Sequence, residues 1–173
     1  IGYLGRVREL KTFTLLLEAV KLIPVAKRPK IIIAGDGIKA NEVRQLMMDA
    51  VESGEIEAEV SGAFTPIQFQ ELVKQLDVMF ALYPPERGNI SQGALPVKMF
   101  DAAANGIPSI VNSDCLMGEL AESERIGKAV VWNDALATSN AMLELRGTTV
   151  ELKISSQREK KRFLSTVLPL LDD

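Results

Sequence analysis

An acidic residue, Asp101, lies in the first half of a predicted helix of small residues, where its carboxylate can do chemistry. The segment 95–111 reads LPVKMFDAAANGIPSIV, in which Pro96 suits a first helical position and Gly106 suits the stop just past a helix end. Residues 109–111 are then predicted to form a short buried strand. A carboxylate at this place either benefits from the helix dipole alone or also holds a ligand.

Composition excludes several other kinds of chemistry. The 173 residues include no histidine and one cysteine, Cys115, so this chain has no His-based general base and no zinc cluster. A single cysteine also excludes an internal disulfide framework and fits a reducing compartment. The net charge of −3 gives no reason to expect nucleic acid, and no apolar run is long enough to span a membrane. The length suits one globular α/β domain.

Hydrophobic periodicity predicts strands that alternate with helices along the chain. Strands are expected at 1–4, 30–34, 57–64, 77–85, 109–111 and 128–132. Helices are expected at 11–22, 41–53, 65–76 and 96–105, and the part after residue 135 is expected to be mostly helical with a break near Gly147. This alternation is typical of a doubly wound α/β fold, a Rossmann-like parallel sheet of about six strands with helices on both faces.

In such sheets the ligand lies outside the carboxyl ends of the strands, where glycine turns meet helix starts. The segments that fit this edge are Gly5-Arg6 with Lys11, 35–37, 62–64, 83–101 and 113–119. Each also has a plain structural explanation, because Arg6 and Lys11 can be solvated charges. A phenylalanine such as Phe64 is more often a core residue than a stacking partner, and Lys98 can be a lysine on a helix surface. Ala40 stands where a dinucleotide-binding fingerprint carries its third glycine, which disfavours a nicotinamide cofactor.

Taken in order, four segments resemble the C-terminal domain of GT-B glycosyltransferases, in the large retaining group called glycosyltransferase family 4 or group 1. They read IGYLGRVRELKTFTLLLEAVKLIP, KIIIAGDG, AEVSGAFTPIQFQELVKQLDVMFALYPP and PVKMFDAAANGIPSIV, and the resemblance runs to about residue 145. Its most specific parts are the Gly-Arg opening with Lys11 and the block acid-A-x-A-x-G-x-P that begins at Asp101. The resemblance implies a GT-B fold and the half of the enzyme that binds the nucleotide-sugar donor.

The resemblance also implies roles for particular residues. In the family, the arginine and lysine of the opening motif contact the donor diphosphate, and these match Arg6 and Lys11. A planar guanidinium suits phosphate oxygens, and a lysine adds a mobile charge. The family's acid at the head of the small-residue helix holds the ribose hydroxyls and matches Asp101, whose ionised carboxylate can accept two hydrogen bonds. The remaining candidates for the nucleotide and donor pocket are Gly5, Gly35, Gly37, Gly62, Phe64, Tyr83 and Gly93.

Departures from the family pattern bear on activity. The family pairs its ribose-binding acid, usually Glu rather than Asp, with a glutamate eight positions earlier that is credited with positioning the sugar. Here that earlier position is Gly93. Glu86 can replace the glutamate if residues 87–91 are an insertion, and no other catalytic residue is identified. A P-x-K variant occurs among relatives that lack the first glutamate, so Lys98 can offer a compensating charge near the phosphates.

The implied function is transfer of a sugar from a UDP- or GDP-sugar to an unknown acceptor, with retention of configuration. No metal or cofactor is expected, because cationic side chains and helix dipoles can neutralise the leaving diphosphate. Residues 1–173 are then a single nucleotide-sugar-binding domain from a two-domain chain, with an acceptor-binding half before residue 1, and the isolated domain is expected to be inactive. We expect a cytoplasmic location, with contact at the inner face of a membrane only through the parent protein.

Two other functions stay open. A non-catalytic nucleotide- or sugar-binding module, a degenerate transferase domain, is favoured by the missing glutamate and opposed by the intact Arg6, Lys11 and Asp101. A nucleotide-sugar epimerase shares the GT-B architecture but is expected to carry histidines and more acids. The tail, about residues 147–173, is predicted to be helical and to pack on the domain, with an amphipathic membrane-contacting helix as the alternative.

Overall fold

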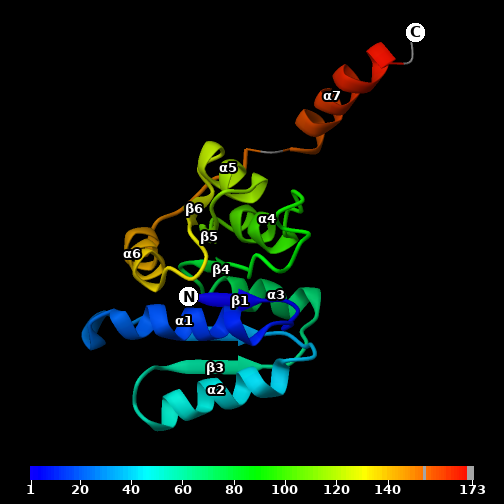
Figure 1. Cartoon of the computed structure of the whole chain (residues 1–173). Helices are drawn as coiled ribbons and strands as arrows, with labels where there is room; N and C mark the ends of the chain where they lie inside the picture. The colour runs from blue at the N-terminus through cyan, green and yellow to red at the C-terminus, as the bar shows by residue number, and fades with distance from the viewer. Residues whose placement is uncertain (154, 171–173) are drawn as a thin grey trace.

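A parallel sheet forms the centre of the molecule in the computed structural model, which describes residues 1–153 and 155–170. Within these residues six strands run in the order β3-β2-β1-β4-β5-β6, all parallel. Their bounds are β1 Gly2–Leu4, β2 Ile31–Ala34, β3 Ala58–Ser61, β4 Met79–Ala81, β5 Ser109–Asn112 and β6 Gly127–Val130. The order reverses between β1 and β4, which is the point where doubly wound sheets bind ligands. The prediction of a Rossmann-like parallel sheet is confirmed (Figure 1).

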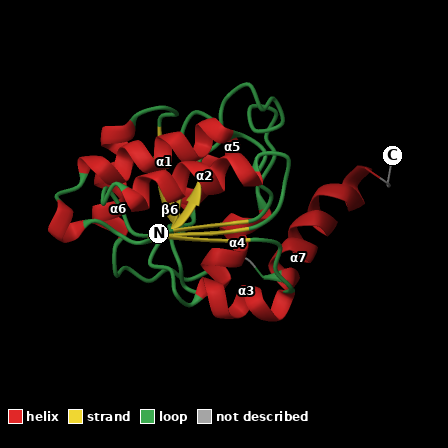
Figure 2. Cartoon of the chain, turned by 90° about the horizontal axis from the view of Figure 1, so that it is seen from below, coloured by secondary structure: helices red, strands yellow, loops and turns green. Residues whose placement is uncertain are grey.

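Helices cover both faces of the sheet, as the alternating pattern predicts (Figure 2). Three helices pack with the large cluster of buried residues on one face: α1 Leu10–Leu22, α2 Ala40–Glu52 and α6 Ala135–Leu145. Three others pack with the clusters on the opposite face: α3 Pro66–Val73, α4 Val97–Ala104 and α5 Leu116–Ser123. The remaining elements are the short 3₁₀ turns Val25–Lys27 and Leu168–Leu170 and the helix α7 Ser156–Val167.

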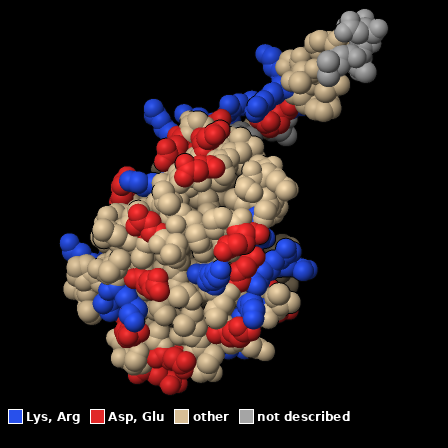
Figure 3. All heavy atoms as spheres, in the orientation of Figure 1, with Lys and Arg blue, Asp and Glu red and all other residues tan. Residues whose placement is uncertain are grey.

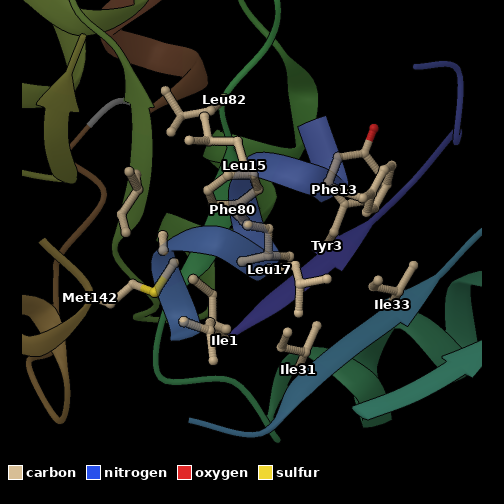
Figure 4. Packing of buried hydrophobic residues seen from close by; sticks show 14 of the residues in the cluster. Ile1, Tyr3, Phe13, Leu15, Leu17, Ile31, Ile33, Phe80, Leu82 and Met142 are labelled. Carbon is tan, nitrogen blue, oxygen red and sulfur yellow. The ribbon is translucent and has the colours of Figure 1, made fainter. Parts of the chain in front are cut away.

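The core follows from the two-residue period of the strands. In β2, Ile31 and Ile33 belong to the cluster under α1, whereas Ile32 belongs to the cluster on the opposite face. The ring of Tyr3 from β1 meets that of Phe13 from α1 edge to face, with centroids 4.7 Å apart (Figure 4). Such aromatic pairs contribute about 0.5–1.5 kcal/mol beyond their buried area, so this contact fixes the start of α1 over β1.

The helix α4 ends as the sequence predicts and begins one residue later. Pro96 is its N-cap rather than its first helical residue, and Gly106 adopts a φ of 79° just past its end. Ala102 and Ala103 are buried in it, and these small side chains let α4 lie close on β4 and β5. The helix α3 also starts as predicted, because Thr65 and the side chain of its third helical residue form a reciprocal capping box.

The observed elements differ from the expected ones at α5 and at β4. The sequence does not predict the helix α5, because Gly118 interrupts the short helical pattern within SDCLMGELAES, residues 113–123. The strand expected at 77–85 is shorter, Met79–Ala81, because beyond Ala81 the side chain of Asn112 takes the place of a backbone partner for Tyr83.

The helix α7 projects away from the sheet instead of packing on it (Figure 1). Its Phe163 and the following Leu168 are 63% and 53% exposed. A forked ion pair between Arg158 and Glu124 is its side-chain link to the domain within the described residues. The expectation of a packed tail is therefore wrong for residues 156–170, and residues 154 and 171–173 of that tail lie outside the described residues.

Candidate functional site

The carboxyl ends of β1, β2 and β3 are tied together by their glycine turns. The N–H of Gly5 donates to the carbonyl of Ala34 at 2.9 Å, and the N–H of Gly35 donates to the carbonyl of Gly62 at 2.9 Å. The exposed ends of three parallel strands thus become one continuous backbone edge. The sequence predicts a ligand at this edge.

Glycine is required at two positions of this edge because the loops touch. A side chain at Gly35 would place its Cβ 1.8 Å from the carbonyl oxygen of Gly5, and one at Gly37 would place its Cβ 2.1 Å from that of Val7. Both glycines also have a positive φ, 150° and 156°. The glycines of the G-D-G turn therefore bring two loops into backbone contact, which is a structural requirement independent of any ligand.

A cavity of about 400 Å³ opens at this edge. Its lining residues are Gly5, Arg6, Gly35, Asp36, Gly37, Ala63 and Phe64. Five of the predicted site residues thus meet in one cavity whose size lies within the range for ligand sites, about 300–1,000 Å³. Arg6 is exposed there, while the Asp36 carboxylate accepts a hydrogen bond from the N–H of Gly37 at 2.7 Å. Phe64 is half-buried, so it lines the cavity and also packs against the core.

Lys11 lies apart from this cavity. Its Nζ donates to the carboxylate of Glu86 at 3.1 Å, and the two side chains are 70% and 67% exposed. Both line two neighbouring cavities of about 390 and 410 Å³ beside the start of α1. The pKa of Glu86 is lowered by a hydrogen bond from its own backbone N–H and then by Lys11. The two candidates are therefore brought together, with Glu86 as the partner of Lys11 in this structure.

Tyr83 is buried rather than exposed to a donor pocket. Its N–H donates to the side-chain oxygen of Asn112, and the Asn112 amide donates to its carbonyl, both at 2.8 Å. The guanidinium carbon of Arg87 lies 4.7 Å from the centroid of the Tyr83 ring. A guanidinium nitrogen of Arg87 lies 3.8 Å from the carboxylate of Glu9. Tyr83 thus holds the segment after β4 against β5 and against the loop before α1.

Lys98 is not a surface residue. Its Nζ lies 3.1 Å from the centroid of the Tyr3 ring and 5.6 Å from that of Tyr83. The amine is shielded from solvent and makes no hydrogen bond within the described residues. The plain explanation, a lysine on the helix surface, is therefore wrong.

Asp101 follows Lys98 by three residues on α4 and is exposed. Partial burial raises the pKa of its carboxyl group, and no hydrogen bond to that carboxylate forms within residues 1–153 and 155–170. Asp101 does not line the cavity at Arg6. The structure leaves it available to a ligand without bringing it into contact with the other candidates.

Gly93, where the resemblance would place a glutamate, has a φ of 88°. A side chain rarely adopts this backbone conformation, so the loop is built here for glycine. Its nearest side-chain neighbour would be Leu116, 3.6 Å from an added Cβ.

Five residues of this region are not singled out in the sequence, although two of them, Asp36 and Arg87, lie within the segments 35–37 and 83–101 that are expected at this edge: Tyr3, Glu9, Asp36, Arg87 and Asn112. Asp36 stands inside a turn that was recognised, so a polar residue between two glycines was the available signal. The others act through contacts across the sheet, such as Asn112 with Tyr83, and no spacing along the chain signals them. Among the described residues, no group of three or more Cys, Asp or Glu side chains is arranged to hold a metal ion.

Charges of both signs alternate over the surface that Figure 3 shows, with no broad field of one sign. The part of the chain that the structure describes contains no helix long and apolar enough to cross a membrane.

Comparison with known proteins identifies a family whose profile matches this sequence and solved structures that share its fold. A profile of the family described as glycosyl transferases group 1 matches residues 1–147. No curated protein sequence matches the chain significantly.

Solved structures share the fold. The catalytic domain of cholesterol-alpha-glucosyltransferase from Helicobacter pylori superposes with a TM-score of 0.59 at 16% identity, covering 83% of this chain and 84% of that one. A mutant of S. aureus TarM in complex with UDP superposes with a TM-score of 0.59 at 16% identity, and the match covers 83% of this chain and 28% of TarM. The pneumococcal O-GlcNAc transferase GtfA in complex with UDP and GlcNAc superposes with a TM-score of 0.56 at 14% identity, and the match covers 83% of this chain and 28% of GtfA. The chain thus spans most of the first relative and less than a third of the other two.

Proposed function

Because this chain belongs to the group 1 glycosyl transferases, whose profile covers residues 1–147, we propose that it binds the nucleotide-sugar donor of a sugar transfer reaction. The donor is a UDP- or GDP-sugar, and the sugar passes with retention to an acceptor held by another part of the enzyme. The chain is the C-terminal domain of a GT-B enzyme in this proposal. UDP is present in the structures of TarM and GtfA, which supports a uridine nucleotide as the first to test.

The cavity at Arg6 is the observation that carries this proposal. It combines an exposed guanidinium with the backbone of two glycine turns at the carboxyl ends of parallel strands. A guanidinium makes bidentate bonds to phosphate oxygens, and glycine turns let a diphosphate approach the backbone closely. A nucleoside diphosphate with its phosphates beside Arg6 uses each of these features.

Lys11 and Asp101 complete the donor site in this proposal. The carboxylate of Asp101 accepts hydrogen bonds from the ribose hydroxyls. Lys11 leaves Glu86 to neutralise the second phosphate, and the free N–H groups at the start of α4 add to that neutralisation. With this much positive charge, the leaving diphosphate is stabilised without a metal ion.

A non-catalytic module that binds the same nucleotide is the second candidate. The backbone at Gly93 favours it, because a φ of 88° suits glycine and not the glutamate that the family uses to position the sugar. The two candidates share the donor site and differ in turnover. Only the first predicts that the chain, joined to an acceptor-binding domain, transfers sugar.

A thermal unfolding assay with a panel of ligands tests the proposal. A ligand that binds the folded state alone raises the melting temperature, and at about 100 times its Kd it adds about 2.7 kcal/mol. We expect UDP, GDP or their sugar derivatives to raise the melting temperature and NAD to leave it unchanged. If no nucleoside diphosphate or nucleotide sugar at millimolar concentration shifts the transition, the proposal is wrong.

A further inference from the structure

The cavity of about 390 Å³ beside the start of α1, here called the cavity at Trp132, lies between that helix and the loop that joins β6 to α6. The helix α1 packs beside α6 (Figure 2). One wall of the cavity is a stripe of α1 from Lys11 to Glu18, whose members are spaced by three and four residues and so share a face. The other wall is the loop, with Trp132 and Asn133, and Glu86 after β4 also lines the space.

The fold leaves most polar groups of this cavity unused. The carboxylate of Glu18 and the amide of Asn133 are exposed and make no hydrogen bond or ion pair among the described residues. The indole N–H of Trp132 also finds no acceptor within residues 1–153 and 155–170. The hydroxyl of Thr14 donates to the carbonyl of Leu10 at 3.3 Å and can still accept a hydrogen bond. The cavity therefore offers both donors and acceptors to a ligand.

The charges of the cavity disfavour an anionic ligand. Of the residues that line it, Lys11 carries the one positive charge, whereas Glu18 and Glu86 are both acidic. The Nζ of Lys11 is already paired with the carboxylate of Glu86 at 3.1 Å. A lining with more negative than positive charge repels a phosphate or a nucleotide and suits a neutral ligand that carries hydroxyl groups.

Trp132 adds an apolar surface to these polar groups. It is the one tryptophan of the chain, and it is half-buried, because it packs against the large core cluster and also lines the cavity. An indole combines a broad apolar face with a single N–H donor, which suits a place where one side is apolar and the other is wet. A pyranose ring has matching surfaces, with C–H groups on its faces and hydroxyl groups around its edge.

We propose that the cavity at Trp132 binds a pyranose ring of a carbohydrate, with a C–H face of the ring against the indole and its hydroxyl groups hydrogen-bonded to Glu18, Asn133 and Thr14. A carboxylate accepts hydrogen bonds from two neighbouring hydroxyls, and an amide both donates and accepts. The volume of about 390 Å³ is that of a ligand site. This inference goes beyond the proposed function, because it requires no nucleotide in the cavity at Arg6.

The single tryptophan reports on its own cavity, because its indole N–H gives one resonance in a ¹⁵N–¹H correlation spectrum. The methyl pyranosides of glucose, galactose and mannose and free N-acetylglucosamine are titrated into the 173-residue chain. We expect at least one sugar to move the Trp132 resonance until it saturates, with a Kd on the order of 1–10 mM, the scale that about a dozen ligand atoms allow. Sorbitol, an open-chain polyol, is the ligand control and should leave the resonance in place.

Two variants remove single polar groups from opposite walls of the cavity: Glu18→Gln and Asn133→Gly. Glycine tolerates the φ of 65° at position 133, so Asn133→Gly removes the amide without straining the backbone. Each variant is expected to weaken sugar binding about three- to tenfold, the scale of one hydrogen bond. Glu71→Gln, on the exposed surface of α3, is the matched control and should bind sugar as the unchanged protein does.

UDP, GDP and their sugar derivatives separate two sources of the ring. Saturable shifts of the Trp132 resonance by the free sugars assign the cavity to a separate glycan. Shifts by a UDP- or GDP-sugar, with none by the free sugars or by the nucleotide without its sugar, assign the cavity to the glycosyl group of the donor. Either result supports the inference.

Four results overturn the inference. They are no movement of the Trp132 resonance with any free sugar or nucleotide sugar, equal movement with sorbitol, movement by UDP or GDP alone where the free sugars have no effect, and unchanged sugar binding in both variants. The first three need only the unchanged protein. The melting-temperature assay with nucleotides decides the proposed function separately, since sugar binding without nucleotide binding keeps this inference and contradicts that function.

Discussion

The side chain of Asn112 makes two reciprocal hydrogen bonds with the backbone of Tyr83, each 2.8 Å long and buried. Asn112 ends β5, and Tyr83 follows β4, so the amide replaces ladder bonds that these strands lack beyond Ala81. The pair fixes where the segment after β4 leaves the sheet. That segment carries Arg87, and Tyr83 itself forms one wall around Lys98.

Asn112→Ala is expected to lower the free energy of unfolding by about 2–4 kcal/mol, because two buried backbone groups lose their partner. Urea denaturation followed by circular dichroism measures the change. Asn105→Ala is the matched control, since its amide donates a single, exposed bond to the carbonyl of Asp101. Equal losses in the two variants would contradict the role of the buried pair.

Gly35→Ala is expected to destabilise the protein by more than about 2 kcal/mol, since a Cβ there overlaps the carbonyl of Gly5 and the backbone has a positive φ. Gly62→Ala is the control, because nothing lies within 4 Å of a Cβ at that position. We expect the control to change the free energy of unfolding by less than about 0.5 kcal/mol. Denaturation midpoints that move equally would show that the glycine turns are not in close contact.

Much of the fold was predictable, because strand and helix periods are local properties of the chain. The buried strand at 31–34 follows from its continuous run of apolar residues. The end of the small-residue helix follows from Gly106, which is a typical residue just past a helix end. The helix α5 was missed because a glycine stands inside it. That glycine is needed there, since a Cβ at Gly118 would meet the carbonyl of Asn112 at 2.5 Å, and this contact exists only in the folded sheet.

The candidate site was less predictable, because its residues meet across the sheet. The glycines and Arg6 could be placed at the carboxyl edge from their position after strands, and they do line one cavity. The burial of Lys98 depends on Tyr3, which is 95 positions earlier in the chain and faces it only after β1 and β4 have paired. No motif in a single sequence records such a pairing.

Glu86→Gln is expected to strengthen nucleotide binding several-fold, because the neutral amide no longer competes with phosphate for Lys11. The stability should stay within the error of a denaturation curve, since both side chains are largely exposed. Glu71→Gln, on the exposed surface of α3, is the control. Weaker binding in Glu86→Gln, as measured by calorimetry, would instead place Glu86 among the groups that hold the donor.

Arg6→Ala is expected to weaken the binding of UDP or GDP by about 1.5–3 kcal/mol, or roughly 10- to 150-fold, the scale for a lost hydrogen bond to a charged group. Arg44→Ala removes an exposed arginine from α2 and serves as the control for net charge. Calorimetric titrations of both variants give the comparison. Equal affinities in Arg6→Ala and the unchanged protein would remove Arg6 from the phosphate site.

The binding of UDP and 2′-deoxy-UDP to the unchanged protein and to Asp101→Asn tests the account most directly, since it asks whether a ribose lies at Asp101. The cycle of four affinities isolates the interaction between that carboxylate and the 2′-hydroxyl. We expect either change alone to cost roughly tenfold or more in affinity, and the second change to cost little once the first is made. Melting temperatures should hardly move, because an acid in this part of a helix contributes only about 0.3–1 kcal/mol through the dipole. Two costs that add in full, or an Asp101→Asn protein that binds UDP as tightly as the unchanged one, would contradict the donor site proposed here.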